Sequence, residues 1–420
     1  MKATKIFMMA ALALTFAACS NNDDIDLAQQ PDNNEITITA TVSSDDATTR
    51  ALSPDGSNIA STWETTDQFA ILFNDGTSDV KRVATISSIN GSTVTITFTI
   101  PSSLASNTAC TIVYPASAAN AANTGADVAT ALATQDGTIG NCPEVRVGTA
   151  TIDKDNHNLT SVTKLTAQNA IFKFTLQDLS AGAKSATEFK VSDGSGNVMT
   201  TVTPGSASGE LYVALPVMAA GTYWFNATID SKSYIAKATT AAATVAGKYY
   251  QTTVKMATIG DVILDDGKFA ARSSDTGTKV AMIAYLGSET DHATYKHGLA
   301  LALSDEGSMS WTNATGASGA AAHTPAAPTT TSSWMLPSKD QWNKMIDACK
   351  NVLGTNNNYL DLRGGFSDIT GASNLQSSDY WSRSEYDSDS SHAWYCSFNN
   401  GVRSHVGKNF NFRVRACLAF

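Results

Sequence analysis

A strict alternation of apolar and polar residues is the feature that most constrains the fold of this chain. Residues 93–100 read Thr93-Val94-Thr95-Ile96-Thr97-Phe98-Thr99-Ile100, so every second side chain is apolar. Successive side chains of a strand point to opposite faces of a sheet, and this period therefore predicts a strand with one buried face. We expect further strands of this kind at residues 35–42, 69–73, 110–114, 170–176, 223–228 and 249–256.

The spacing of these segments predicts compact β-domains. Turn signals such as Pro54-Asp55-Gly56 and Asn74-Asp75-Gly76 lie between them, and no helical pattern intervenes. Short strands with this spacing are typical of a β-sandwich. We therefore expect a first sandwich over residues 35–162 and a second, smaller one over 163–257.

Residues 258–420 form a third block because they contain the clearest helical pattern. Ser338 suits the N-cap of a helix, and Gln341 suits the third position of a capping box. Gly354 would end this helix. Six apolar residues recur at helical spacing on one face: Trp342, Met345, Ile346, Cys349, Val352 and Leu353.

The end of the third block returns to strands. Asn399-Asn400-Gly401 predicts a hairpin turn. Residues 412–420 predict a last strand, which has an apolar residue at every second position. The fold class that we expect is thus mostly β, with an α+β domain at the C-terminus.

The first residues predict export. Lys2 and Lys5 precede an apolar run over residues 6–18, which is too short to span a bilayer and suits a signal peptide. The run closes on Ala17-Ala18-Cys19, a pattern typical of bacterial lipoproteins, in which the cysteine carries the lipid. We therefore expect a signal peptide at 1–18 and lipidation at Cys19. The alternative is an ordinary secretory signal that contains a cysteine.

Polar residues follow Cys19 at once. Residues 20–26 resemble the acidic signal that sends some lipoproteins to the outer face of the outer membrane. Residues 19–34 contain too few apolar side chains to pack, so we expect a flexible tether. The predicted location is the cell outer membrane, with the protein lipid-anchored and facing the extracellular side.

Composition excludes several partners. The formal net charge is −10, charged residues make up 16% of the chain, and no Lys/Arg cluster is present. This balance argues against nucleic acid and anionic lipid head groups as partners. With Cys19 lipidated, five of the six cysteines remain. None has the spacing of a zinc site, so we expect no metal and no cofactor.

Residues 35–256 carry several motifs that resemble fimbrillin-like proteins, the family of type V pilins and related surface adhesins. The motifs are Trp63-Glu64-Thr65-Thr66-Asp67, Tyr114-Pro115, Gln135-Asp136-Gly137, Gly140-Asn141, Phe172-Lys173-Phe174 and Ala246-Gly247-Lys248-Tyr249-Tyr250. The resemblance implies two transthyretin-like β-sandwich domains, export as a lipoprotein, and fimbrillin-like subunits as strand-exchange partners in a fimbrium, or pilus.

The resemblance also gives a meaning to Arg50 and Ala51, which follow the first predicted strand. In fimbrillins a trypsin-like protease cuts after an arginine in this region and frees the first strand. A strand from a neighbour then fills the groove. The resemblance implies proteolytic maturation between Arg50 and Ala51. The alternative is that Arg50 is simply an exposed arginine in a loop.

The last residues resemble a second family. The motifs are Trp334-Met335-Leu336-Pro337-Ser338, Tyr380-Trp381-Ser382-Arg383-Ser384-Glu385, Ala393-Trp394-Tyr395 and Val414-Arg415-Ala416. Together they are similar to C-type-lectin-like modules of the major-paralogous and formylglycine-generating-enzyme-like kind. In that fold the helix and the final strand pack together, which implies a disulfide between Cys349 and Cys417. Cys110 and Cys142 are the other candidate pair.

No catalytic residues stand out. The enzyme relatives of this fold hold copper with two closely spaced cysteines near the C-terminus, and this chain lacks that spacing. Glu385, Asp387 and Asp389 could hold calcium, but solvated loop carboxylates are the favoured interpretation. We place the partner contact on the loop that begins at Trp381 and includes Glu385, Tyr386, Asp387 and Asp389.

The function that these patterns favour is that of a non-enzymatic cell-surface adhesin, as an accessory subunit at the tip of a fimbrium. Its partners would be other fimbrillin-like subunits and a protein or glycan on a host or bacterial surface. The alternative is a surface lipoprotein that binds a glycan or protein and does not polymerise.

Overall fold

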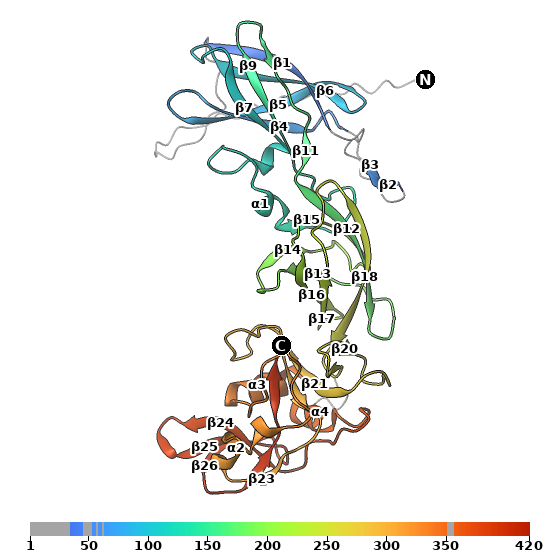
Figure 1. The fold of residues 1–420 in the computed structure, drawn as a ribbon, viewed down its shortest axis with the longest axis vertical. Helices are drawn as coiled ribbons and strands as arrows, with labels where there is room; N and C mark the ends of the chain where they lie inside the picture. Colours follow the sequence, from blue (N-terminus) through green and yellow to red (C-terminus); the bar gives the residue numbers. More distant parts are fainter. Residues whose placement is uncertain (1–33, 45–52, 56–57, 61–62, 351–356) are drawn as a thin grey trace, which may run out of the picture.

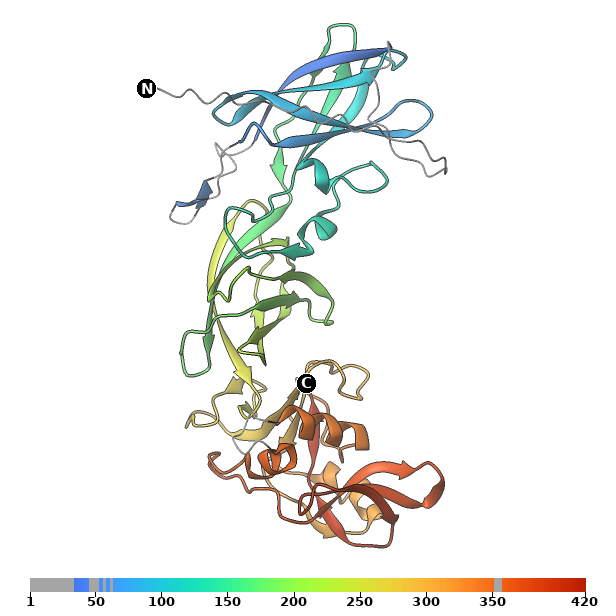
Figure 2. The ribbon, with the colours of Figure 1, turned by 180° about the vertical axis from the view of Figure 1, so that it is seen from behind.

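The computed structural model describes residues 34–44, 53–55, 58–60, 63–350 and 357–420. Three units follow one another along an elongated molecule (Figure 1). Figure 2 shows the same arrangement from behind, with the C-terminus at the junction of the second and third units. Strands dominate the described residues, which confirms the mostly β class.

The N-terminal unit is an antiparallel sheet in the order β1-β6-β5-β4-β7-β9-β10, with β11 beside β9. Every second residue of β6 is buried, as the alternation predicts. The sheet curls until β1 approaches the β9–β10 turn, where Thr39 N donates to His157 O at 3.1 Å. Its strands are β1 (Glu35–Ser43), β4 (Gln68–Asn74), β5 (Asp79–Asn90), β6 (Thr93–Pro101), β7 (Thr108–Tyr114), β9 (Arg146–Asp153), β10 (Asn158–Thr160) and β11 (Thr166–Ala167).

Short elements accompany this sheet. The strands β2 (Ser53–Asp55) and β3 (Asn58–Ala60) pair with each other. A 3-10 turn over Ala116–Ala118 and helix α1 (Val128–Leu132) lie between β7 and the middle unit.

The motif residues near Trp63 are part of the core. Trp63 and Tyr114 pack edge to face with ring centroids 4.9 Å apart. The Tyr114 hydroxyl donates to the Asp67 carboxylate at 3.1 Å, and the same carboxylate accepts from Glu64 N at 2.9 Å. These bonds satisfy buried polar groups, so the motif is structural in this chain.

The middle unit is a second eight-stranded sheet in the order β15-β12-β18-β17-β16-β13-β14-β8. Strands β12 and β18 run parallel, whereas their other partners are antiparallel. Its strands are β8 (Thr134–Gln135), β12 (Asn169–Asp178), β13 (Glu188–Ser192), β14 (Val198–Val202), β15 (Glu210–Pro216), β16 (Gly221–Ile229), β17 (Lys232–Thr240) and β18 (Tyr249–Thr258).

The boundary expected at residue 162 does not follow the sheets. Strand β11 still pairs with β9 of the N-terminal unit, and the middle unit begins at β12. Strand β8 lies inside the expected first domain but pairs with β14 of the middle unit. The Gln135 side chain fixes it there, because its amide bonds Ala214 O at 2.8 Å and Thr200 Oγ1 at 3.0 Å.

The C-terminal unit has two five-stranded sheets, in the orders β20-β19-β21-β22-β28 and β23-β27-β24-β25-β26. The first contains β19 (Val262–Leu264), β20 (Phe269–Ala270), β21 (Lys279–Leu286), β22 (Gly298–Ala302) and β28 (Cys417–Ala419). The second contains β23 (Gly307–Met309), β24 (Asp379–Tyr386), β25 (Asp389–Ser397), β26 (Arg403–Gly407) and β27 (Phe412–Val414). The helices are α2 (Trp311–Thr315), α3 (Lys339–Ala348) and α4 (Asn358–Gly364), with a 3-10 turn over Ala320–Ala322.

Helix α3 begins with the predicted capping box. Gln341 N donates to the Ser338 hydroxyl at 3.1 Å, and Ser338 N donates to the side-chain oxygen Oε1 of Gln341 at 2.8 Å. Trp342, Met345 and Ile346 are buried on its apolar face. The helix ends at Ala348, with Cys349 as its C-cap, which is earlier than expected. Val352, Leu353 and Gly354 lie outside the described residues.

The last nine residues form two short strands in different sheets, where we expected one. Val414, Ala416, Leu418 and Phe420 pack into one hydrophobic cluster, and Cys417 and Ala419 pack into another. The alternation is therefore real, but both faces of the segment are buried from Val414 to Phe420.

Candidate functional site

The C-terminal unit carries a projecting hairpin made by β24 and β25 (Figure 1). Strand β26 extends this sheet through the predicted Asn399-Asn400-Gly401 turn, which is confirmed. Gly401 has a φ of 78°, and a Cβ atom there would lie 2.8 Å from the Tyr359 ring. Only glycine fits this position, so the turn is fixed by its sequence.

Trp381 is not a contact residue, contrary to our expectation. Its side chain is fully buried, its indole nitrogen donates to Met309 O at 2.9 Å, and its ring packs 4.7 Å from that of Phe412. Trp381 lies on the inner face of β24. It is therefore a core residue that joins the hairpin to β27.

The other four predicted contact residues lie at the outer end of the hairpin. Glu385, Asp387 and Asp389 are exposed, and Tyr386 is half-buried. The Glu385 carboxylate pairs with Lys408 Nζ at 2.8 Å, and the Asp389 carboxylate pairs with His392 Nδ1 at 2.7 Å. Glu385 and Asp389 therefore bind different partners and do not converge on one point.

Four aromatic side chains gather on the outer face of this sheet; we call Tyr386, His392, Trp394 and His405 the aromatic platform. Trp394 and His405 are direct cross-strand partners, with ring centroids 5.8 Å apart. Tyr386 stacks on His405 at 3.6 Å with an interplanar angle of 7°. All four side chains are half-buried. Aromatic rings that are fixed in position and partly exposed are typical of partner-binding surfaces.

Charged groups border the aromatic platform. Lys339 Nζ, from the first turn of α3, lies 4.6 Å from the centroid of the Trp394 ring, which is a cation–π contact. A hydrogen bond from the Ser391 hydroxyl lowers the pKa of the Asp389 carboxyl, with a further bond from Ser391 N. Asp389 is therefore ionised at neutral pH and supplies a fixed acceptor at the rim.

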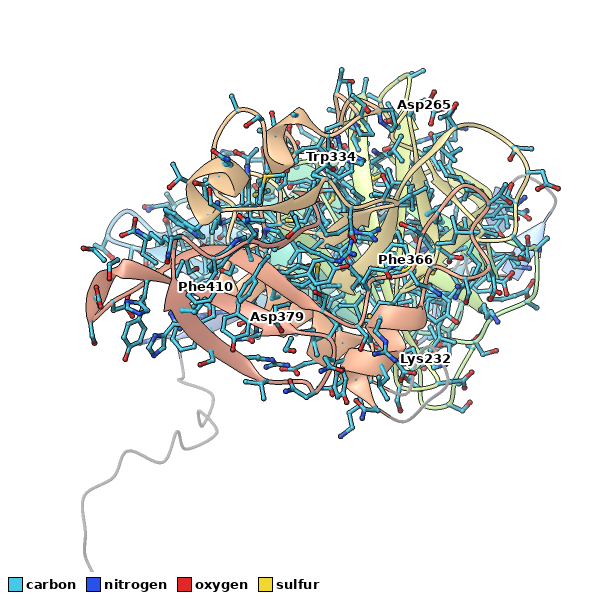
Figure 3. The ribbon with its side chains drawn as sticks, turned by 90° about the horizontal axis from the view of Figure 1, so that it is seen from below. Lys232, Asp265, Trp334, Phe366, Asp379 and Phe410 are labelled. Carbon is cyan, nitrogen blue, oxygen red and sulfur yellow. The ribbon has the colours of Figure 1, made fainter. Side chains whose placement is uncertain are left out.

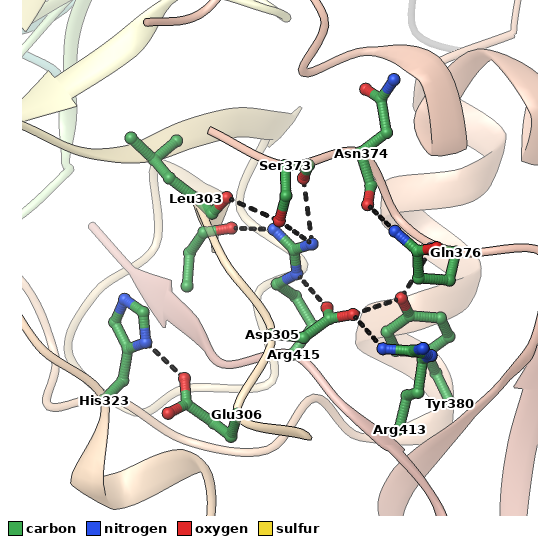
Figure 4. Close-up of polar contacts among 11 residues, drawn as sticks. Leu303, Asp305, Glu306, His323, Ser373, Asn374, Gln376, Tyr380, Arg413 and Arg415 are labelled. Carbon is green, nitrogen blue, oxygen red and sulfur yellow. Dashed lines mark hydrogen bonds and ion pairs between the residues drawn. The ribbon is translucent and has the colours of Figure 1, made fainter. Parts of the chain in front are cut away.

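A buried polar network holds the frame behind the hairpin (Figure 4). Arg415 is fully buried; its Nε bonds the Asp305 carboxylate at 2.7 Å and its Nη1 bonds Ala302 O at 2.8 Å. The Tyr380 hydroxyl donates to the same carboxylate at 2.8 Å. Every partner of this buried charge is fixed by the fold, so the network positions β24 and β27 and leaves the contact surface to other residues.

The structure corrects the prediction of two disulfides. All five cysteines in the described residues are free thiols, and neither expected disulfide is present. Cys110 lies in the core of the N-terminal unit, whereas Cys142 lies in the cluster that joins it to the middle unit. Cys349 and Cys417 share one core, but their Sγ atoms face Ala284 O and the Gln341 side chain. Burial raises the pKa of Cys110, Cys396 and Cys417 to about 12, so these thiols are unreactive.

Three predicted site residues, Cys19, Arg50 and Ala51, lie outside the described residues. Among the residues that the structure describes, no helix is both long and apolar enough to cross a membrane. In the same part of the chain, no three His, Cys, Asp or Glu side chains cluster in a way that could hold a metal ion.

The aromatic platform was only partly visible in the sequence. Figure 3 views the molecule from the end of the C-terminal unit, where Asp379 and Phe410 mark the sheet of β24 to β26. The sequence singled out Tyr386 but gave no signal for His392 or His405. The structure supplies the missing signal, because the register of β25 and β26 about the Asn399-Asn400-Gly401 turn places His405 opposite Trp394.

No protein-family model matches this chain, and no curated protein matches it. Some solved structures match parts of this chain at low similarity. A fimbrial protein from Bacteroides ovatus is 12% identical over 92% of this chain and 99% of that chain, with a TM-score of 0.30. A fimbrial assembly protein from Parabacteroides distasonis is 11% identical over 52% of this chain and 90% of that chain, with a TM-score of 0.29. The C-terminally truncated tip fimbrial protein Mfa3 from Porphyromonas gingivalis is 13% identical over 48% of this chain and 81% of that chain, with a TM-score of 0.22.

Proposed function

We propose that this chain is a non-enzymatic cell-surface adhesin that is exported with a lipid anchor at Cys19 and, once cleaved after Arg50, serves as an accessory subunit at the tip of a fimbrium. The proposal keeps the two transthyretin-like domains and the C-type-lectin-like module as its fold assignment. The observation that carries it is the burial of the C-terminal segment, which supports one direction of assembly over the other.

The C-terminal segment cannot leave its unit without unfolding it. Phe420 is 2% exposed; its carbonyl oxygen accepts from His297 N at 2.7 Å, and its own N donates to Gly298 O at 3.1 Å. Strand β28 lies beside β22 in the sheet. A strand that is this deeply buried and hydrogen-bonded is part of the core, so it is unsuited to fill a groove in another subunit.

The opposite end of the molecule offers a groove if β1 is removed. Strand β1 pairs with β6 over nine residues, and its side chains Ile38, Ala40 and Val42 are buried. Cleavage after Arg50 would cut the connection from β1 to the rest of the chain. The groove left between β6 and the β9–β10 turn would then present unpaired β6 backbone and three vacant side-chain sites to an incoming strand.

A subunit that accepts a strand and cannot donate one occupies an end of a fibre. The aromatic platform lies at the opposite end of the molecule from β1 (Figure 1). Contact at the platform therefore leaves the accepting end free for the shaft. The partner would be a protein or glycan on a host or bacterial surface, because rings with a polar rim suit either.

A specific observation favours a second function. With β1 in place, the N-terminal sheet is fully paired along β6 and has no groove to offer. A chain that is never cut after Arg50 would remain a monomer and act as a surface lipoprotein that binds a glycan or protein. Proteolysis at this one position separates the two functions.

Treatment of the purified chain with an arginine-specific protease tests the proposal. We expect a cut after Arg50, loss of the β1 fragment, and capture of a synthetic strand that copies residues 35–43. The Arg50→Ala variant is the matched control and should neither be cut there nor capture the strand. Cleavage without strand capture would favour the monomeric function.

A further inference from the structure

A cavity of about 390 Å³ lies at the junction of the middle and C-terminal units. Its floor is the outer face of β13 and β16, and its wall is the segment that connects β21 to β22. Its volume is within the range of small-molecule sites. It lies away from the aromatic platform and shares no residue with it.

The floor is a row of polar side chains in register. Lys190 lies directly opposite Asn226, and Glu188 lies opposite Thr228. The next pair, Ser192 and Trp224, lies at one end of the row. The alternate residues of the same strands, such as Phe189 and Phe225, fill the core of the middle unit. The outer face is thus polar because of the strand period, and the core anchors it from behind.

Two of these polar side chains line the cavity itself. Ser192 is 4% exposed, and Asn226 lies in the middle of the floor. A hydroxyl and an amide that face a cavity can both donate and accept hydrogen bonds with a ligand or water there.

The cavity is close to electrically neutral. Lys190 and Glu188 neutralise each other in an ion pair at 2.7 Å. His297 stacks on the Trp224 ring at 3.8 Å, and burial, aided by the nearby Lys237 charge, lowers its pKa to about 4. The imidazole is therefore uncharged at neutral pH and presents one donor and one acceptor. Lys296, which is exposed at the rim of the cavity, is the exception because its side chain is charged.

We propose that this cavity binds a neutral sugar unit of one or two rings. Sugars present rows of hydroxyl groups, each of which both donates and accepts. The cavity supplies matching hydroxyl, amide and imidazole groups along one face, and the half-buried Tyr234 ring offers an apolar surface for C–H groups. The site goes beyond the proposed adhesin function and does not depend on fibre assembly, because it lies between two units of one chain.

The full mature chain can be titrated with single sugars by saturation-transfer NMR and calorimetry. The probes are galactose, mannose, fucose and N-acetylglucosamine as neutral sugars, with glucuronate as the acidic comparison. We expect a neutral sugar to bind in the millimolar range. Asn226→Leu and Ser192→Ala should each weaken binding by roughly tenfold, as expected for a lost ligand hydrogen bond.

Gln251→Leu is the matched control, because Gln251 is an exposed amide on β18 of the same sheet and lies outside the cavity. Its sugar affinity should equal that of the natural chain. Equal thermal midpoints for all variants would show that the Asn226→Leu effect is local. No neutral sugar binding, or binding that Asn226→Leu leaves unchanged, would overturn the site. Binding of glucuronate alone, lost in Lys296→Ala, would overturn the assignment to a neutral sugar.

Discussion

Deletion of residues 417–420 should unfold the C-terminal unit, if the terminal strand belongs to its core. Leu418 and Phe420 are 0% and 2% exposed. Exposing two large apolar side chains costs about 3–6 kcal/mol, at roughly 1.5–3 kcal/mol each. Backbone bonds are lost as well, among them Ser332 N to Ala419 O at 2.8 Å and Cys417 N to Met335 O at 2.8 Å. At about 1 kcal/mol each they bring the total near the whole stability of a domain.

The assay is near-ultraviolet circular dichroism with limited proteolysis of the full chain. The truncated chain should lose the tryptophan signal of the C-terminal unit and become sensitive to protease beyond residue 258, while the first two units stay resistant. Leu418→Ala is the milder variant and should cost about 2–5 kcal/mol without full unfolding. Val402→Ala, at a side chain that is 45% exposed, should change little. A truncated chain that keeps its signal and its resistance would show that the strand is dispensable and free to be donated.

Three further predictions concern particular side chains. Trp394→Ala should abolish adherence to the partner surface with little change in thermal midpoint, whereas Phe410→Ala, at a 51% exposed ring outside the aromatic platform, should adhere normally; equal adherence of both variants would remove the platform from the contact. Because His297 has a lowered pKa of about 4 and the unfolded chain protonates near 6.5, its contribution to stability is complete above pH 6.5. It should fall by on the order of 1–2 kcal/mol as the pH drops toward 4, after allowance for solvent screening, and His297→Phe should flatten this part of the profile in urea titrations. The five buried thiols should resist maleimide in the native chain and all react after unfolding without a reductant; fewer than five labels would reveal a disulfide.

The sequence predicted the elements whose signal is local. The alternation over β6, the capping box at Ser338 and the turn at Asn399-Asn400 all match the structure, because each depends on residues a few positions apart. The sequence did not predict the parallel pairing of β12 with β18 or the crossing of β8 into the middle unit. Those contacts join residues 78 positions apart, as in Ile171 and Tyr249, and 67 positions apart, as in Thr134 and Thr201, and no local pattern specifies them.

The candidate contact site also combines features that local sequence patterns predict with features that long-range packing decides. Trp381 and Trp394 both lie in aromatic strand segments, and the sequence does not tell which face of its strand each occupies. The structure decides this through long-range packing: Trp381 faces Phe412 in the core, and Trp394 faces His405 on the outer side. The expected disulfides failed for a related reason, since burial in one core does not bring two sulfur atoms into bonding geometry.

Immunogold labelling of sheared fibres, with an antibody against the C-terminal unit, tests the tip assignment most directly. The account predicts label at one end of each fibre and none along the shaft. It also predicts that Arg50→Ala, by keeping β1 in its groove, removes the end label while the protein stays on the cell surface. Label spaced along the shaft would mean that the chain both accepts and donates a strand, and would contradict the account.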